Sequence, residues 1–247
     1  GRGVKMAAPT TAAVPSANKR ISVCYLSMLC EKGSSESTIC GLHPDGANDG
    51  QWFASRLEEL GLLSTTDNIQ LTTTTVHISH GDALPDVCTF DVIVLGGTFH
   101  SVHGKRPWQQ ALQLWLHEYR ATGKPMLGIC GGHQAMTVAL GGAVTKRSAS
   151  TQVGSVPVIL TEAGTLHLLF SGMNSNDSTD SSTSPGPRFH FGNSDEVSTV
   201  PENATILAST LDSPAVAIDY GGGWVSVQFH PEASASIFQH WVDSGVL

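Results

Sequence analysis

The sequence lacks the features that mark membrane, secreted and nucleic-acid-binding proteins. No apolar run reaches the ~20 residues that a membrane-spanning helix needs, and residues 1–20 lack the apolar core of a secretory signal. Lys and Arg are few, 13 against 21 Asp and Glu, and they are scattered, which disfavours nucleic acid and anionic membranes as partners. We therefore expect a cytoplasmic protein that acts on a small molecule.

Cysteine is also scarce and irregularly placed. The chain has an odd number of cysteines and no C-x-x-C pair, so we predict neither a disulfide framework nor a zinc site, and we expect reduced thiols. Cys24 and Cys88 lie inside or beside apolar runs, where a free cysteine usually acts as a small buried hydrophobic residue. The sequence indicates no cofactor and no metal, and it contains no Gly-x-x-x-x-Gly-Lys loop for ATP.

What the sequence does contain is an alternation of strand and helix patterns. The chain has 247 residues, 40% of them apolar, which is enough for one domain with a large core. Buried-strand patterns over 21–27, 91–97 and 125–129 alternate with amphipathic helix patterns over 48–63 and 107–123. A strand-rich later part ends in a helix pattern over 235–245. This order predicts a three-layer α/β fold in which helices cover both faces of a mainly parallel sheet.

Two segments fall outside this pattern. We interpret residues 1–19 as a disordered tail or a cloning remnant, and residues 20–247 as a single domain. Within that domain, the polar, low-complexity segment at about 174–187 is expected to be a surface loop that carries no motif.

Cys130 lies in the stretch Gly128-Ile129-Cys130-Gly131-Gly132, between a strand pattern and a helix pattern. The spacing Gly-x-Cys-x-Gly is that of a nucleophile elbow with sulfur in place of the serine oxygen. Gly128 and Gly132 leave room for a tight, strained turn, so we expect the sulfur to be exposed. The helix N-terminus favours a thiolate there, and the N–H of Gly131 is free to bind an oxyanion.

His230-Pro231-Glu232 supplies a base and a partner for it. The buried-strand pattern over 224–229 ends abruptly at this tripeptide, at the sheet edge where parallel strands deliver their ligands. Glu232 can hydrogen-bond the imidazole of His230 and fix its tautomer, which gives a Cys-His-Glu arrangement with the logic of a catalytic triad. For His133, in the first turn of the elbow helix, we predict a structural role.

Together the two motifs resemble those of the class I glutamine amidotransferase family. The chain has G-x-C-x-G-H-Q at 128–134 and Q-F-H-P-E at 228–232, and its stretch 92–103 is similar to the family's glycine-rich oxyanion strand. The similarity runs from about Asp91 to Glu232 and looks closest to the single-domain, GMP-synthase-like and γ-glutamyl-peptidase-like members. The resemblance implies the family's flavodoxin-like αβα fold.

The resemblance also implies a reaction. Cys130 would attack the γ-carboxamide of glutamine or of a γ-glutamyl amide, His230 would exchange the proton, and Glu232 would orient His230. Water would then hydrolyse the γ-glutamyl thioester.

Four further residues would bind the substrate. The N–H of Gly131, joined by that of Gly97 or Thr98, would hold the tetrahedral oxyanion. Gln134 would help to hold the amino-acid end of the substrate.

Two departures from the family pattern concern the rim of the substrate pocket. Gly131 stands where relatives usually have a bulky residue, and we expect it to widen the pocket. Asn193 stands where the family has a histidine before Asp-Glu-Val, and His190 is a candidate to replace that histidine.

Three functions therefore stay open. The chain is a self-sufficient hydrolase of glutamine or γ-glutamyl amides, a glutaminase subunit that delivers ammonia to a separate synthetase such as a GMP synthase, or a non-catalytic binding protein. The first needs only its small-molecule substrate, whereas the second needs a synthetase partner chain.

Overall fold

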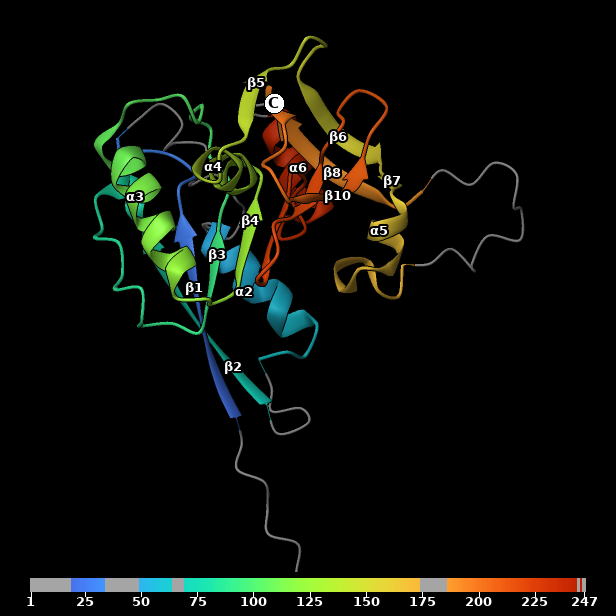
Figure 1. Ribbon diagram of the computed structural model, residues 1–247. Coiled ribbons are helices and arrows are strands. Elements are labelled where there is room, and N and C mark those ends of the chain that lie inside the picture. Colours follow the sequence, from blue (N-terminus) through green and yellow to red (C-terminus); the bar gives the residue numbers. More distant parts are fainter. Residues whose placement is uncertain (1–18, 34–48, 64–68, 174–185, 244, 246–247) are drawn as a thin grey trace, which may run out of the picture.

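The computed structural model describes residues 19–33, 49–63, 69–173, 186–243 and 245, and is built around an eight-stranded sheet (Figure 1). The strand order is β2-β1-β3-β4-β12-β11-β10-β7. The parallel part consists of β1 (Lys19–Ser27), β2 (Ile69–His77), β3 (Val92–Leu95), β4 (Met126–Ile129) and β12 (Trp224–Val227). The antiparallel part consists of β11 (Ala217–Asp219), β10 (Thr205–Ser209) and β7 (Ile159–Leu160).

Helices and two small ladders surround this sheet. The helices are α2 (Asp49–Glu59), α3 (Pro107–Ala121), α4 (Gly131–Ala139), α5 (Glu162–Leu166) and α6 (Ala235–Asp243), with 3-10 turns η1 (Ile78–His80) and η2 (Leu168–Phe170). The antiparallel ladders pair β5 (Ala143–Lys146) with β9 (Asp195–Thr199), and β6 (Gln152–Pro157) with β8 (Arg188–Asn193).

The side chains of β1 show why the sheet needs cover on both faces. Successive strand residues point to opposite faces, so Cys24 and Leu26 join the core under α3 and α4, while Val23 and Tyr25 join the core on the other side. Figure 1 shows α3 and α4 on one side of the sheet and α2 and α6 on the other. The predicted three-layer α/β architecture with a mainly parallel sheet is confirmed.

Several details differ from the predictions. The strands β5, β8 and β9 were not predicted from the sequence. Of the predicted tail, residues 1–18 lie outside the described part, but Lys19 already belongs to β1. Most of the predicted surface loop, residues 174–185, also lies outside the described part. Among the described residues, no helix is long and apolar enough to cross a membrane.

The cysteines are less uniform than expected. Cys24 is fully buried, as predicted, and burial raises the pKa of its thiol to about 12. Cys88 is exposed, so its predicted burial is wrong, because it lies in the turn before β3 and not within the strand. Cys30 is disulfide-bonded, which contradicts the expectation that all the thiols are reduced.

Candidate active site

Cys130 occupies the single position between the end of β4 and the start of α4, as the elbow pattern predicts. Its backbone has φ 51° and ψ −103°, a left-handed conformation that non-glycine residues rarely adopt. Two backbone hydrogen bonds hold the turn: Cys130 N–H donates to Val227 O at 2.8 Å, and Gly132 N–H donates to Gly96 O at 3.0 Å. The strain is therefore maintained by the neighbouring strand β12 and by Gly96, which directly follows β3.

The two framing glycines are required by close packing of the strand and the helix. A Cβ atom on Gly128 would lie 2.5 Å from the Sδ of Met136. A Cβ atom on Gly132 would lie 2.1 Å from the backbone oxygen of Leu95, which no side-chain movement could relieve. The predicted reason for both glycines, room for the turn, agrees with these distances.

The sulfur-bearing residue is not exposed, so that expectation is wrong. Cys130 is only 5% exposed, because the backbone after β3 and the ring of His230 cover it. A Cβ atom on Gly97 would lie 3.6 Å from the Cβ of Cys130 and 3.0 Å from the Cε1 of His230. Gly97 thus brings the strand backbone against both side chains.

His230 and Glu232 form a buried pair beside Cys130. The Nδ1 of His230 lies 2.7 Å from the Oε1 of Glu232, and the residues are 5% and 3% exposed. Burial alone lowers the pKa of His230, but the charges of Glu232 and Cys130 and hydrogen bonds to both raise it well above its usual value. The structure therefore brings together the residues predicted as nucleophile, base and acid.

Aromatic residues that sequence reasoning missed hold the His230 ring in place. The ring packs edge-on against Phe238 at 5.5 Å and Trp241 at 5.8 Å, both from α6. The N–H of His230 donates to the carbonyl of His190 at 2.9 Å, and the His190 ring stacks on Phe238 at 4.8 Å. The sequence signal for these contacts was the amphipathic pattern of the last helix, because an apolar helix face packs against another part of the chain.

The backbone of Thr98 lies close to Gly131. A Cβ atom on Gly131 would lie 2.8 Å from the backbone nitrogen of Thr98 and 2.4 Å from its Cγ2. Within the described part of the chain, neither the N–H of Gly131 nor that of Thr98 donates to a protein group. The same contact corrects the expectation that Gly131 widens the pocket, because the Thr98 methyl group occupies the space that a side chain at 131 would enter.

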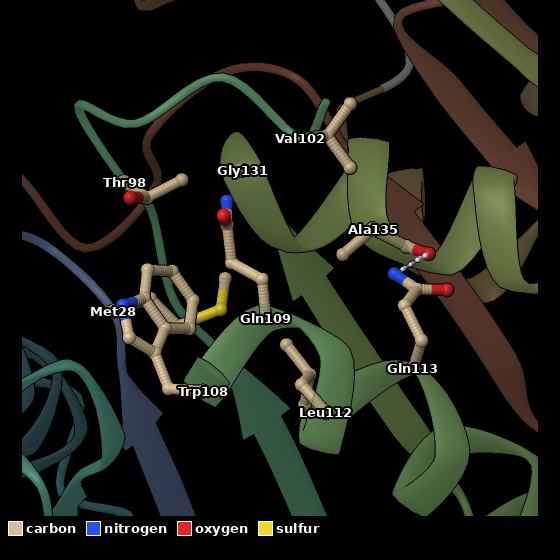
Figure 2. A pocket seen from close by; sticks show the side chains of 9 residues that line it. All are labelled: Met28, Thr98, Val102, Trp108, Gln109, Leu112, Gln113, Gly131 and Ala135. Atoms are coloured by element: carbon tan, nitrogen blue, oxygen red, sulfur yellow. Dashed lines mark hydrogen bonds between the residues drawn. The ribbon is translucent and has the colours of Figure 1, made fainter. Parts of the chain in front are cut away.

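A small cavity lies behind this contact (Figure 2). Its volume is about 20 Å³, enough for roughly one water molecule and too small for a glutamine side chain. It lies between α3, α4 and the loop after β3, and its lining is mostly apolar: Met28, Thr98, Val102, Trp108, Gln109, Leu112, Gln113, Gly131 and Ala135.

Gln134 and Asn193 meet at the backbone of Asp195. The Nε2 of Gln134 donates to the carbonyl of Asp195 at 3.0 Å and to the Oε1 of Gln228 at 3.1 Å, and the Nδ2 of Asn193 donates to the same carbonyl at 3.0 Å. Both residues are buried, at 5% and 4% exposure, so Asn193 does not lie at an open rim as expected.

His133 has the structural surroundings that were predicted for it. It is fully buried, and its Nδ1 lies 2.7 Å from the Oγ of Ser226. That hydroxyl lies 2.9 Å from the hydroxyl of Tyr220, which in turn lies 2.8 Å from the Oγ1 of Thr137. Burial lowers the pKa of His133 to about 3, so its imidazole is neutral and links α4 to the sheet.

Comparison with known proteins now decides the family. The family model for glutamine amidotransferase class-I matches residues 50–245. The chain belongs to the class I glutamine amidotransferase family. Of the curated relatives of this family member, a glutamine-hydrolyzing GMP synthase from Aeropyrum pernix is 33% identical over 190 residues, 76% of this chain and 31% of the relative. The glutamine amidotransferase-like protein chry6 from Gibberella zeae is 43% identical over 89 residues, 34% of this chain and 37% of the relative.

Solved structures of amidotransferases share the fold. A glutamine amidotransferase from Thermotoga maritima superposes with a TM-score of 0.66 at 17% identity, over 91% of this chain and 81% of the other. A glutamine amidotransferase from Methylobacillus flagellatus superposes with a TM-score of 0.65 at 17% identity, over 94% of this chain and 77% of the other. At these identities the likeness concerns the fold alone, and it agrees with the class I amidotransferase fold of this family member.

Proposed function

We propose that this chain hydrolyses the γ-carboxamide of glutamine, or of a γ-glutamyl amide, through a γ-glutamyl thioester on Cys130. The observation that carries the proposal is the buried contact of 2.7 Å between His230 Nδ1 and Glu232 Oε1, next to a cysteine in a left-handed elbow. Charge and hydrogen bonding join Cys130 to His230 and, with Glu232, raise the pKa of the imidazole despite its burial. A protonated imidazole beside a cysteine favours the thiolate, which is the attacking form.

Each proton in the proposed reaction has a donor and an acceptor. The Cys130 thiolate attacks the amide carbon, and the N–H groups of Gly131 and Thr98, with Gly97 beside them, stabilise the oxyanion; one such donor is worth about 3 kcal/mol. The carbon–nitrogen bond breaks as His230 protonates the leaving amine. Neutral His230 then takes a proton from water, whose oxygen attacks the thioester and releases glutamate, while Glu232 stays ionised throughout.

Gln134 is the proposed contact for the amino-acid end of the substrate. Its amide nitrogen is already used by Asp195 and Gln228. In the described part of the chain no hydrogen bond uses its Oε1, so this oxygen is the atom that would accept from the substrate's ammonium group.

A second candidate is a glutaminase that delivers ammonia to a synthetase chain. One finding favours it: the Aeropyrum relative is named a glutamine-hydrolyzing GMP synthase, and this chain spans only 31% of its length. For this function the chain would need a partner that holds the ammonia acceptor.

The test is release of glutamate and ammonia from glutamine and from γ-glutamyl dipeptides. We expect activity in the unaltered protein, none in Cys130→Ser, and full activity in Cys88→Ser, because Cys88 is an exposed thiol outside the site. Undiminished activity of Cys130→Ser would overturn the proposal. Glutaminase activity that rises when a synthetase chain is added would favour the second candidate.

A further inference from the structure

The central sheet ends in two very different edge strands. One edge is β7, which is two residues long and so offers little backbone to another strand. The other edge is β2, a strand of nine residues that pairs with β1 alone in the part of the chain that the structure describes. An edge strand leaves a row of backbone N–H and C=O groups without strand partners. β2 is therefore the edge of the sheet that can accept a further strand.

β2 lacks the features that usually protect an edge strand from pairing. Natural edge strands carry charged residues or proline, or are bent by a bulge. The sequence of β2, IQLTTTTVH, has no charged residue, no proline and no glycine, and its register with β1 is unbroken from Ile69 to His77. Its middle consists of four β-branched residues, Thr72–Thr75, which favour the extended conformation. The strand is thus straight, uncharged and suited to pairing.

The first part of β2 also needs support that its own sheet does not give. In the described part of the chain, β3 pairs with β1 only over Val23–Leu26, so Lys19–Ile21 and their partners Ile69–Leu71 form a ribbon of two strands. Figure 1 shows this ribbon extending beyond the other strands, and Ile69 is 42% exposed. Two strands without a third are marginally stable in water. A strand added beside β2 would supply the third.

We propose that β2 pairs in antiparallel fashion with β2 of a second copy of this chain, so that the two sheets join across a two-fold axis. The start of β2 in one copy then lies beside the end of β2 in the other, where β1 and β3 support it. An axis at Thr73 places Thr72 of one copy opposite Thr74 of the other, and opposed threonines stabilise antiparallel strands. The pairing opposes no like charges, because β2 carries none.

The symmetry of this contact favours a second copy over an unrelated peptide. Both copies use the same surface, so one contact covers both ribbons and leaves neither β2 edge free for a third chain. A contact made mainly by one pair of strands is small, so we expect a weak dimer that depends on concentration. In the order of the sheet, β1 and β3 separate β2 from β4, which leads to the elbow at Cys130. The inference is therefore independent of the proposed function.

The main test replaces Thr72 and Thr74 together with lysine. Both side chains are exposed, so we expect the chain to fold, whereas the dimer would bring lysines opposite each other. Light scattering after gel filtration measures the mass between about 1 and about 100 µM. The mass of the unaltered protein should rise from that of one chain toward that of two. The double variant should stay at one chain, with the dissociation constant raised at least about tenfold.

A matched control adds the same charge elsewhere. Thr165→Lys combined with Thr199→Lys changes two exposed threonines, on α5 and β9, and should dimerise like the unaltered protein. Should the β2 variant fail to fold, hydrogen exchange of the unaltered protein gives the answer instead. Backbone amides of β2 should then exchange at least about threefold more slowly at about 100 µM than at about 1 µM, and those of α5 equally at both.

Three results would overturn the inference. They are a single-chain mass at every concentration without slower exchange in β2, a dimer that persists in the Thr72→Lys/Thr74→Lys protein, and assemblies that grow beyond two chains. A dimer abolished by this double variant and kept by the control supports the inference. Glutamine hydrolysis at an unchanged rate is expected in both variants, and if the unaltered protein dimerises through β2 but hydrolyses nothing, only the proposed function fails.

Discussion

Replacing His133 with asparagine should make the protein less sensitive to acid. His133 is fully buried, and burial lowers its pKa to about 3, whereas histidine in an unfolded chain titrates near about 6.5. Between these two values the unfolded chain binds a proton that the folded chain does not. The stability from burying neutral His133 is therefore complete above about pH 6.5 and is lost progressively as the pH falls toward about 3.

The expected magnitude follows from this difference. At about pH 4.5, two units below the unfolded pKa, the loss is about 2.7 kcal/mol, because each unit corresponds to about 1.4 kcal/mol. Asparagine can still hydrogen-bond Ser226 but does not titrate, and the smaller side chain lowers stability equally at both pH values. We expect urea unfolding to show a decrease in the free energy of unfolding between about pH 7.5 and about pH 4.5. This decrease should be about 2.7 kcal/mol larger for the unaltered protein than for the variant. Equal losses would refute the reasoning.

Three further changes test the packing and the site. Gly132→Ala places a Cβ atom 2.1 Å from the backbone oxygen of Leu95. We therefore expect urea unfolding to show at least about 2–3 kcal/mol of destabilisation, together with loss of activity. A variant of unchanged stability would show that the elbow is loosely packed. Glu196→Ala leaves Arg147, whose side chain is 2% exposed and lies 3.0 Å from Glu196, without its ion partner, and should cost about 3–5 kcal/mol. The matched control Glu59→Ala, which breaks a solvent-exposed pair, should cost less than about 1 kcal/mol, and equal costs would contradict the assigned burial. Glu232→Gln should lower kcat by at least about 100-fold with KM little changed, since the amide can neither fix nor stabilise the charged imidazole, and normal turnover would remove Glu232 from the mechanism.

The parts of the site that could be predicted are those encoded in short stretches. The turn at Cys130 needs glycine on both sides, and His230 follows a strand pattern and precedes Pro231, so both motifs can be recognised without knowing what they contact. The alternation of buried strands and amphipathic helices likewise predicts the layers, because a strand covered on both faces reads as a continuous apolar run.

The parts that could not be predicted depend on contacts between distant residues. The burial of Cys130 comes from Gly97 and His230, and the space beside Gly131 is filled by Thr98, which lies 33 positions earlier in the sequence. Neither contact has a local pattern, so the expected exposure of the sulfur and the expected wide pocket were both wrong.

The same limit applies to Cys88. It stands next to an apolar run, which favours burial, yet the turn that precedes β3 leaves it exposed. A shift of a strand boundary by a few residues decides between the two outcomes, and strand boundaries are the least certain part of a pattern.

The most direct test of the central claim is the mass of the Cys130 peptide during turnover. The protein is mixed with glutamine, quenched in acid within the first turnovers and digested, and the peptides are weighed by mass spectrometry. We predict that the Cys130 peptide carries the added mass of one γ-glutamyl group, and that the adduct is absent from Cys130→Ser and from the peptide of Cys88. Release of glutamate and ammonia at an undiminished rate by Cys130→Ser, with no adduct on the unaltered protein, would contradict the account.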